Sequence, residues 1–240
     1  FRHSDIIIST VFNAKDLKAV ITQIKIETNK KFPHIKLLDI STIAPQESLA
    51  LKQEFDDSFY IEMADTPISG SPLSVLSATA SIFFGGNKAT FESTHSILSL
   101  LANHVYFMGH NGSGLMMKLA VNALMLSGLN AFCESLNFCD KVGIKREIAL
   151  DALLESAGSS PFLQGRKNHF LGKTQEQLSN PRIMQKDLEI FNTIAEQQSI
   201  LHHSSKIASK MVNKIFHGQP VLDKDAVIHL LQTIQKQNEF

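Results

Sequence analysis

Cysteine is scarce in this sequence, and neither charge is in excess. Its two cysteines, Cys133 and Cys139, lie on one predicted helix and face different directions, which argues against a disulfide framework and indicates a reducing compartment. Lysine plus arginine and aspartate plus glutamate both number 23. The absence of net charge gives no argument for binding to nucleic acid or to an anionic membrane, and we expect neither as a partner.

Long apolar runs and metal-binding spacings are also missing. No apolar run reaches the length of a membrane span and no secretory signal opens the chain, so we expect a soluble, cytoplasmic protein. The ten histidines form no His-Glu-x-x-His motif, and we expect no metal site. The acidic pairs Asp56-Asp57 and Glu62/Asp65 fit a solvated turn and a strand end more simply than paired catalytic carboxylates.

Apolar runs and helical segments alternate in the first half of the chain. The run from Asp5 to Val11 is largely apolar, which is typical of a strand buried on both faces of a parallel sheet. Further strands are predicted at 35–40, 59–63, 81–84 and 104–108, and helices at 14–27, from residue 46 onward and at 87–101. This alternation predicts an α/β fold with a Rossmann-like, doubly wound parallel sheet for residues 1–109.

From residue 110 onward only helical patterns occur. Helices are predicted at 115–142, 146–157, 185–198, 199–217 and, after a cap at Asp223, up to about residue 237. We therefore expect an all-α C-terminal domain at 110–240, joined to the first domain by the long interdomain helix 115–142. A helical half this apolar also predicts that a second subunit covers part of it, so we expect a homo-oligomer such as a dimer.

The long helix carries two polar residues that stand apart from the others. It ends before Gly143, which is placed for a left-handed cap. Lys118 and Asn122 lie four residues apart on one face of an otherwise apolar segment. A separate stripe that we expect to face solvent contains Asn130, Glu134, Asn137 and Lys141. The pattern leaves two interpretations of Lys118: an amine whose pKa is lowered for proton transfer, or a lysine that reaches water from a core helix.

Five short blocks occur in the order and near the spacing of one known family. They are Asp39-Ile40-Ser41-Thr42-Ile43-Ala44-Pro45, Asp65-Thr66-Pro67-Ile68-Ser69-Gly70, Gly85-Gly86, Gly112-Ser113-Gly114 followed by Lys118 and Asn122, and Lys186-Asp187-Leu188. On these blocks the chain resembles the β-hydroxyacid dehydrogenases, the family of 3-hydroxyisobutyrate dehydrogenase and of tartronate semialdehyde and glyoxylate/succinic semialdehyde reductases. The resemblance covers essentially the whole chain.

The resemblance implies residues for proton transfer and for substrate binding. Lys118 matches the catalytic lysine that gives a proton to the carbonyl oxygen during reduction and takes it back during oxidation. Asn122 matches the amide that helps to hold the substrate beside that lysine. Ser69, Gly70 and Ser71 match the turn that binds the substrate carboxylate, largely through backbone N–H groups.

The resemblance also implies residues that contact the cofactor, NAD or NADP. Val11 and Phe12 match a Leu-Pro pair beside the dinucleotide, Thr42 matches a cofactor contact, and Lys186 matches a lysine that reaches toward the cofactor from the helical domain. The implied activity is that of an NAD(P)-dependent oxidoreductase that interconverts a small β-hydroxy acid and its semialdehyde. The cofactor carries the hydride, while the protein supplies orientation, an acid/base and an anion site.

Several positions depart from the family pattern. Ser71, Ser74 and Ala78 stand where glycines are usual, and Val121-Asn122 stands where the family has Asn-Asn. Serine in place of glycine blocks close backbone approach and tolerates a positive φ poorly. These changes favour an alternative, a non-catalytic protein that keeps the dehydrogenase fold as a dimerisation or binding scaffold. The 6-phosphogluconate dehydrogenases, which usually have His-Asn here, and the imine reductases, which generally lack the lysine, match less well.

The Gly-x-Gly-x-x-Gly loop that opens a dinucleotide-binding fold is missing from the first strand-to-helix junction. The family comparison makes the strand at 5–11 a middle strand, so we expect roughly 60 residues to precede Phe1 in the intact protein. The glycines between residues 109 and 114 follow the last strand and fit the start of the long helix instead. The residue that selects NAD or NADP is expected before Phe1, so the sequence predicts no preference between them.

Overall fold

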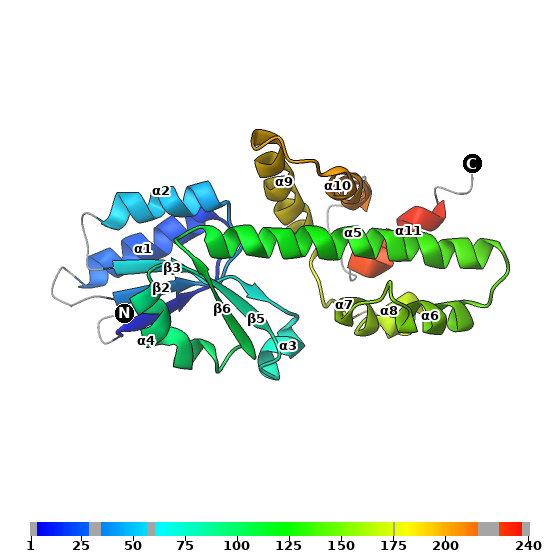
Figure 1. Ribbon diagram of the computed structural model, residues 1–240, viewed down its shortest axis with the longest axis horizontal. Helices are drawn as coiled ribbons and strands as arrows, with labels where there is room; N and C mark the ends of the chain where they lie inside the picture. The colour runs from blue at the N-terminus through cyan, green and yellow to red at the C-terminus, as the bar shows by residue number, and fades with distance from the viewer. Residues whose placement is uncertain (1–3, 29–34, 57–60, 175, 216–225, 237–240) are drawn as a thin grey trace. The chain divides into compact units, whose positions relative to one another are not determined.

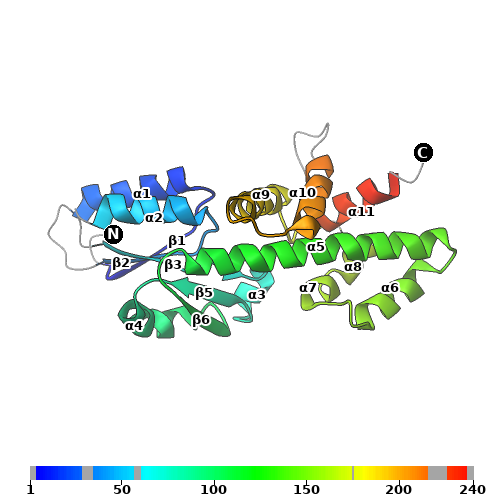
Figure 2. The ribbon, with the colours of Figure 1, turned by 45° about the horizontal axis from the view of Figure 1, so that its top comes forward.

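The computed structural model describes residues 4–28, 35–56, 61–174, 176–215 and 226–236. The chain divides into two compact units, Phe1–Ala120 and Val121–Phe240. The sheet belongs to the first unit, and every described element that lies wholly in the second unit is a helix (Figures 1 and 2). Helix α5 (Ser113–Lys141) begins in the first unit and ends in the second.

The first unit is a six-stranded sheet with helices on both faces (Figure 1). Its elements before α5 are β1 (Ile6–Ser9), α1 (Ala14–Thr28), β2 (Ile35–Asp39), α2 (Pro45–Asp56), β3 (Ile61–Asp65), β4 (Ile68–Ser69), α3 (Pro72–Leu76), β5 (Ser81–Gly85), α4 (Lys88–Leu98) and β6 (His104–Gly109). The strands lie in the order β1-β2-β3-β5-β4, and β6 pairs with β5. The Rossmann-like arrangement predicted from the alternating pattern is confirmed.

Two parallel parts of the sheet meet at an antiparallel junction. Strands β1, β2 and β3 are parallel to one another, and β5 is parallel to β6, as predicted. Strand β5 runs antiparallel to β3, through the single pair Asp65 and Gly85, and also antiparallel to β4. The sheet is therefore mixed. Strand β4 was not predicted because two residues are too few to show the alternation of a strand.

Apolar cores cover both faces of this sheet. The first core contains Leu37 and Met63 from the sheet, Leu17 from α1, Leu51 from α2 and Leu115 from α5. The second contains Leu38 and Ala64 from the same strands, with Phe84 from β5 and Leu98 from α4. Because successive side chains of a strand point to opposite faces, two covered faces explain why these strands are apolar without alternation.

Helix α5 ends at the glycine that the sequence predicts. Gly143 has a φ of 82°, in the left-handed region. Its N–H donates to the carbonyl oxygen of Asp140 at 3.2 Å, and the N–H of Ile144 donates to that of Cys139 at 3.0 Å. These two bonds form a Schellman motif, which satisfies carbonyl groups left without partners at the helix end. The predicted range of 115–142 is confirmed to within two residues at each end.

The composition of α5 differs from expectation in one respect. By length and composition alone the helix is long and apolar enough to cross a membrane, whereas the sequence analysis found no such run. The core helix of a globular protein passes the same test. Leu115, Leu126 and Leu136 of α5 are all buried in apolar cores, so the apolar character of the helix has a structural explanation within the chain.

The prediction that a polar stripe of α5 faces solvent is wrong at two positions. Glu134 and Lys141 are exposed, but Asn130 and Asn137 are buried. Each asparagine directly follows a buried leucine, so the buried face of the helix is wider than its apolar stripe. The amide group of Asn130 donates to Oε1 of Glu134 at 2.9 Å, which gives the buried group a partner at the edge of that face.

The second unit packs helices around one apolar core. After α5 it contains α6 (Arg146–Glu155), α7 (Pro161–Gln164), α8 (Lys167–Phe170), α9 (Pro181–Gln197), α10 (His203–Ile215) and α11 (Ala226–Lys236). The short helices α7 and α8 were not predicted. Helix α9 begins four residues before its predicted start because Asn180 caps it by accepting the N–H of Arg182, with Pro181 in the first turn. The predicted cap at Asp223 lies outside the described residues.

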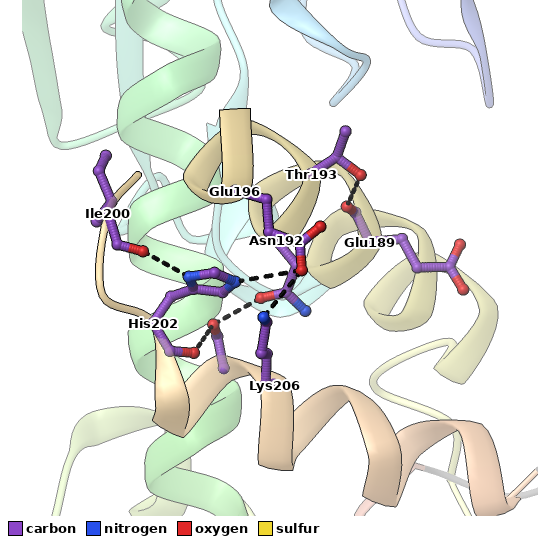
Figure 3. A network of polar contacts seen from close by, with 8 residues as sticks. Glu189, Asn192, Thr193, Glu196, Ile200, His202 and Lys206 are labelled. Carbon is purple, nitrogen blue, oxygen red and sulfur yellow. Dashed lines mark hydrogen bonds and ion pairs between the residues drawn. The ribbon is translucent and has the colours of Figure 1, made fainter. Parts of the chain in front are cut away.

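Polar contacts hold the turn between α9 and α10 (Figure 3). Lys206 of α10 forms an ion pair with Glu196 of α9 at 2.9 Å, and Nε2 of His202 lies 3.8 Å from the same carboxylate. The hydroxyl of Ser205 donates to Oδ1 of Asn192 at 2.6 Å. The Lys206 ammonium lowers the pKa of the exposed Glu196 carboxyl, first through their hydrogen bond and then through charge. These contacts join two helices that the sequence predicts as separate elements.

Candidate functional site

The carboxyl ends of three parallel strands form one edge of the first unit. Ser9, Asp39 and Asp65 are the last residues of β1, β2 and β3, and they are register neighbours across the sheet. In open α/β sheets, ligands bind outside the carboxyl ends of the strands. Val11 and Phe12 follow β1 at this edge and Thr42 follows β2, so the predicted cofactor residues of the first unit lie after adjacent strands.

A buried carboxylate ties the two predicted cofactor loops together. Asp39 accepts hydrogen bonds from the hydroxyls of Ser9 at 2.8 Å and Ser41 at 2.7 Å. The oxygen of Ser41 in turn accepts the backbone N–H of Val11 at 2.7 Å. The side chain of Phe12 is 48% exposed beside this fixed loop. The loop after β1 is thus held at the carboxyl edge of the sheet, with the ring of Phe12 exposed.

The predicted substrate turn lies between β4 and α3. Ser69 ends β4 and pairs with Ser81 of β5. A Cβ on Gly70 would lie 2.9 Å from the Cβ atoms of Ala80 and Ser74, which is too close, so this position requires glycine. The N–H of Ser71 donates to Oγ of Ser74 at 3.3 Å, and the N–H of Ser74 donates to Oγ of Ser71 at 3.2 Å. Two serines that replace family glycines thus bind each other's backbone.

The third replaced glycine has a conformation that favours glycine. Ala78 has a φ of 53°, in the left-handed region where a Cβ costs roughly 1–2 kcal/mol. Its N–H donates to the carbonyl oxygen of Val75 at 3.0 Å, which closes the turn after α3. The backbone of the family pattern is therefore retained at Ala78, although the residue that suits it best is absent.

Lys118 and Asn122 lie one turn apart on α5. Lys118 is 9% exposed and Asn122 is 7% exposed, so both are buried as the apolar pattern around them predicts. The loop before the helix is tied to β3, because the amide group of Asn111 donates to the carbonyl oxygen of Met63 at 2.7 Å. Gly112 has a φ of 89°, which explains why the first glycine of the Gly-Ser-Gly block is needed.

Asp65 binds the start of this helix. Its Oδ1 accepts the N–H of Gly112 at 2.6 Å and its Oδ2 accepts the N–H of Leu115 at 3.0 Å. Burial raises the pKa of the Asp65 carboxyl to about 6, although the backbone hydrogen bonds oppose that rise. The sequence analysis treated Asp65 as a strand end and did not identify this contact. Its only signal was its position as the first residue of a motif block.

Asn122 and Lys186 meet at a third buried carboxylate, in the second unit. The amide group of Asn122 donates to Oδ2 of Asp187 at 2.6 Å. Nζ of Lys186 lies 3.3 Å from Oδ1 of the same residue, which is 1% exposed. The structure therefore brings together two predicted site residues through Asp187, which the sequence analysis quoted within a motif without giving it a role.

Among the residues that the structure describes, no group of three or more His, Cys, Asp or Glu side chains is arranged to hold a metal ion. In the same part of the chain, Cys133 and Cys139 are both free thiols.

Family models match both parts of the chain. The model described as the NAD-binding domain of NADP-dependent 3-hydroxyisobutyrate dehydrogenase matches residues 112–231. The model for the NAD-binding domain of 6-phosphogluconate dehydrogenase matches residues 1–109. Together they cover the predicted sheet domain and most of the helical one.

Individual proteins agree with these models. The chain is 27% identical over 197 residues to glyoxylate/succinic semialdehyde reductase 1 of Arabidopsis thaliana, covering 81% of this chain and 68% of that protein. It is 26% identical over 237 residues to L-threonate dehydrogenase of Haemophilus influenzae, covering 98% and 78%.

A solved structure supports the fold. The crystal structure of 3-hydroxyisobutyrate dehydrogenase from Salmonella typhimurium superposes with a TM-score of 0.81 at 19% identity, covering 95% of this chain and 79% of that one. The matched family models, the ordered motif blocks and this shared fold agree with one another. The chain therefore belongs to the β-hydroxyacid dehydrogenase family, whose cofactor is NAD or NADP.

Proposed function

We propose that this protein interconverts a small β-hydroxy acid and its semialdehyde, with Lys118 as the acid/base. The observation that carries the proposal is the buried pair Lys118 and Asn122 on α5, in a chain that belongs to a dehydrogenase family. The relatives named above are a semialdehyde reductase and a threonate dehydrogenase, and both names describe acids that carry a hydroxyl or aldehyde group.

Each site residue has a defined part in this reaction. When bound, the nicotinamide cofactor would supply or accept the hydride. During reduction, Nζ of Lys118 donates a proton to the carbonyl oxygen, and during oxidation it takes that proton from the hydroxyl. The side chain of Asn122 holds the same substrate oxygen, with its amide oriented by Asp187.

The substrate turn gives the proposal its specificity. Ser69, Gly70 and Ser71 bind the carboxylate, and Val11, Phe12, Thr42 and Lys186 contact the cofactor. Because the N–H of Ser71 already has a partner in Ser74, we expect a carboxylate pocket that differs from those of relatives with two glycines here. The substrate is therefore to be found by a panel of acids rather than by analogy with one relative.

The test is a hydride-transfer assay with Lys118→Ala. Glyoxylate, succinic semialdehyde and tartronate semialdehyde are offered with NADH and NADPH, and consumption of the reduced nicotinamide is followed. We expect turnover by the parent and a loss of roughly 10²–10⁴-fold in kcat in the variant, the usual range for a missing acid/base. Lys141→Ala, an exposed lysine on the same helix, is the matched control and should keep its kcat. Equal kcat in K118A and the parent would remove Lys118 from the mechanism.

A non-catalytic scaffold is the second candidate. The serines at 71 and 74 that satisfy each other's N–H groups, and the left-handed Ala78, favour it. Thermal stability measured with NAD and with NADP separates the two candidates, since a ligand at 100 times its Kd stabilises by about 2.7 kcal/mol. A protein whose Tm responds to neither nucleotide, and which turns over no acid in the panel, is the scaffold.

Assembly and location belong to the same proposal. We propose a homo-oligomer in which a second copy covers exposed apolar side chains of the second unit. The cytoplasm stays our prediction for the compartment.

A further inference from the structure

We propose that Asp65 is the positioning residue for Lys118, because its carboxylate fixes the first turn of α5, directly before the turn that carries the lysine. The inference rests on the proposed function, in which Lys118 exchanges the proton with the substrate. Asp65 itself is given no proton to transfer. Its part is to set where the ammonium group stands.

The contacts place the carboxylate at both ends of the first turn. Oδ1 accepts the N–H of Gly112 at 2.6 Å and Oδ2 accepts the N–H of Leu115 at 3.0 Å. The first N–H groups of a helix have no partner within it, so an outside acceptor decides how that turn is held. Lys118 follows Leu115 by three residues, just under one turn of 3.6 residues. A shift of the first turn therefore moves the lysine directly.

The backbone of two glycines packs closely against the carboxylate of Asp65. A Cβ on Gly85 would lie 2.4 Å from Oδ2 of Asp65, and a Cβ on Gly114 would lie 2.8 Å from the same atom. A Cβ on Gly114 would also lie 2.2 Å from the carbonyl oxygen of Phe83. Strand β5 and the start of α5 thus close around Asp65 only because both positions are glycine, which accounts for two of the motif blocks.

The charge of Asp65 suits this role. The residue is 2% exposed, and its pKa of about 6 leaves it mainly ionised at neutral pH and above. An ionised carboxylate only accepts hydrogen bonds, and its bonds to N–H groups are stronger than those of a neutral acceptor. The loop has a second tether to β3 through Asn111 and the carbonyl oxygen of Met63, so the loss of Asp65 loosens the turn without releasing the loop.

Kinetics of three carboxylate variants test the inference in the whole chain. Asp65→Ala removes both acceptors, whereas Asp65→Asn keeps the shape and one acceptor oxygen. Glu62→Gln is the matched control, a carboxylate on the same strand that accepts from Thr90 of α4 rather than from α5. Because a misplacement of about 1 Å costs on the order of 10²-fold, we expect kcat to fall roughly 10–100-fold in D65A. We expect a partial return of kcat in D65N and no change in E62Q, with every KM within about threefold of the parent.

Amide hydrogen exchange supplies the structural readout. The amides of Gly112 and Leu115 should exchange faster in D65A, while that of Leu129, farther along the same helix, should keep its rate. If D65A fails to fold, D65N alone provides the test. Its single acceptor oxygen can bind only one of the two N–H groups, so we expect faster exchange of at least one amide and a lower kcat. A folded variant with parental kcat, or with unchanged exchange at both amides, overturns the inference.

The two proposals fail in different ways. A parent protein without hydride transfer on any acid refutes the proposed function, and the exchange rates then show whether Asp65 holds the first turn. If the parent is active and D65A has a raised KM with an unchanged kcat, the proposed function stands and the positioning role is refuted.

Discussion

Three buried aspartates, two in the first unit and one in the second, each contact residues that we propose for function or the backbone beside them. Asp39 holds the loop of Val11 through Ser41, Asp65 holds the turn before Lys118, and Asp187 contacts Asn122 and Lys186. A carboxylate offers about four lone-pair sites and can satisfy several donors at once. Its burial costs free energy, so a chain keeps such a residue where the positions of its partners matter more than local stability.

That cost predicts how stability changes with pH. Burial raises the pKa of Asp65 from 3.8 to about 6, so the folded state holds this proton more tightly than the unfolded state. The stability that this tighter proton binding adds is fully present below about pH 3.8 and is lost as the pH rises through about 6. The shift in the pKa of Asp65 corresponds to about 3 kcal/mol. We expect the unfolding free energy of the parent, relative to Asp65→Asn, to fall by up to that amount between about pH 4 and 7.

Urea denaturation across this range measures the difference. Groups other than Asp65 cancel in the comparison because both proteins contain them. A difference that stays flat, or that grows as the pH rises, would contradict the assignment of the raised pKa to Asp65.

Ala78 gives a second prediction at a single residue. Its φ of 53° suits glycine, which adopts the left-handed region without a steric cost. The relief of roughly 1–2 kcal/mol exceeds the added freedom of glycine in the unfolded chain, so we expect Ala78→Gly to stabilise by about 0.5–1 kcal/mol. Ala89→Gly, at an exposed position in the first turn of α4, should instead destabilise by up to about 1 kcal/mol. Chemical denaturation decides, and a lower midpoint for A78G than for the parent would refute the strain at Ala78.

Helix α5 offers a matched pair of glycines at the scale of an element. Gly112, before the helix, has a φ of 89°, whereas Gly128 lies in the middle of the helix with open space where a Cβ would stand. We expect Gly112→Ala to destabilise by at least about 1–2 kcal/mol and Gly128→Ala to stabilise by up to about 1 kcal/mol. Denaturant midpoints of the two variants measure both effects. The same sign of change in both would mean that their backbone conformations do not differ in this way.

Sequence patterns predicted the elements of this fold better than their contacts. The strands and the long helix were predicted because apolar residues with the period of each element run through them, and Gly143 marked the helix end. Strand β4 and helices α7 and α8 are too short to show a period. The burial of Asn130 and Asn137 was missed because the helix packs over a wider face than its apolar residues indicate.

The residues proposed for the site came from the resemblance, and the structure adds contacts that no local pattern showed. The motif blocks carried Lys118, Asn122 and the substrate turn, because a resemblance transfers positions along the chain. The roles of Asp39 and Asp65 depend on strand register and on a loop that returns from 47 residues farther along the chain. No local pattern distinguishes a strand-end aspartate that turns inward from one that faces water.

One long face of helix α5 is not covered by any other part of the chain that the structure describes. In the second unit, this face contains Leu124, Gly128, Ala131, Ser135 and Phe138, all exposed and spaced alternately four and three residues apart. Leu124 is 76% exposed and Phe138 is 64% exposed. Apolar and small residues with this spacing suit the packing of another helix, which agrees with the homo-oligomer expected from composition.

Sedimentation of the purified protein tests this assembly. We expect a mass of at least twice the 26.6 kDa of the chain, because two apolar anchors this exposed would otherwise remain in water. The double variant Leu124→Ser, Phe138→Ser should sediment as a smaller species, since both anchors of the face are lost. Leu76→Ser, at a leucine 84% exposed in the first unit, removes apolar surface elsewhere and should keep the parental mass. A monomeric parent, or an equal response to both sets of changes, would mean that this face of α5 meets solvent rather than a second copy.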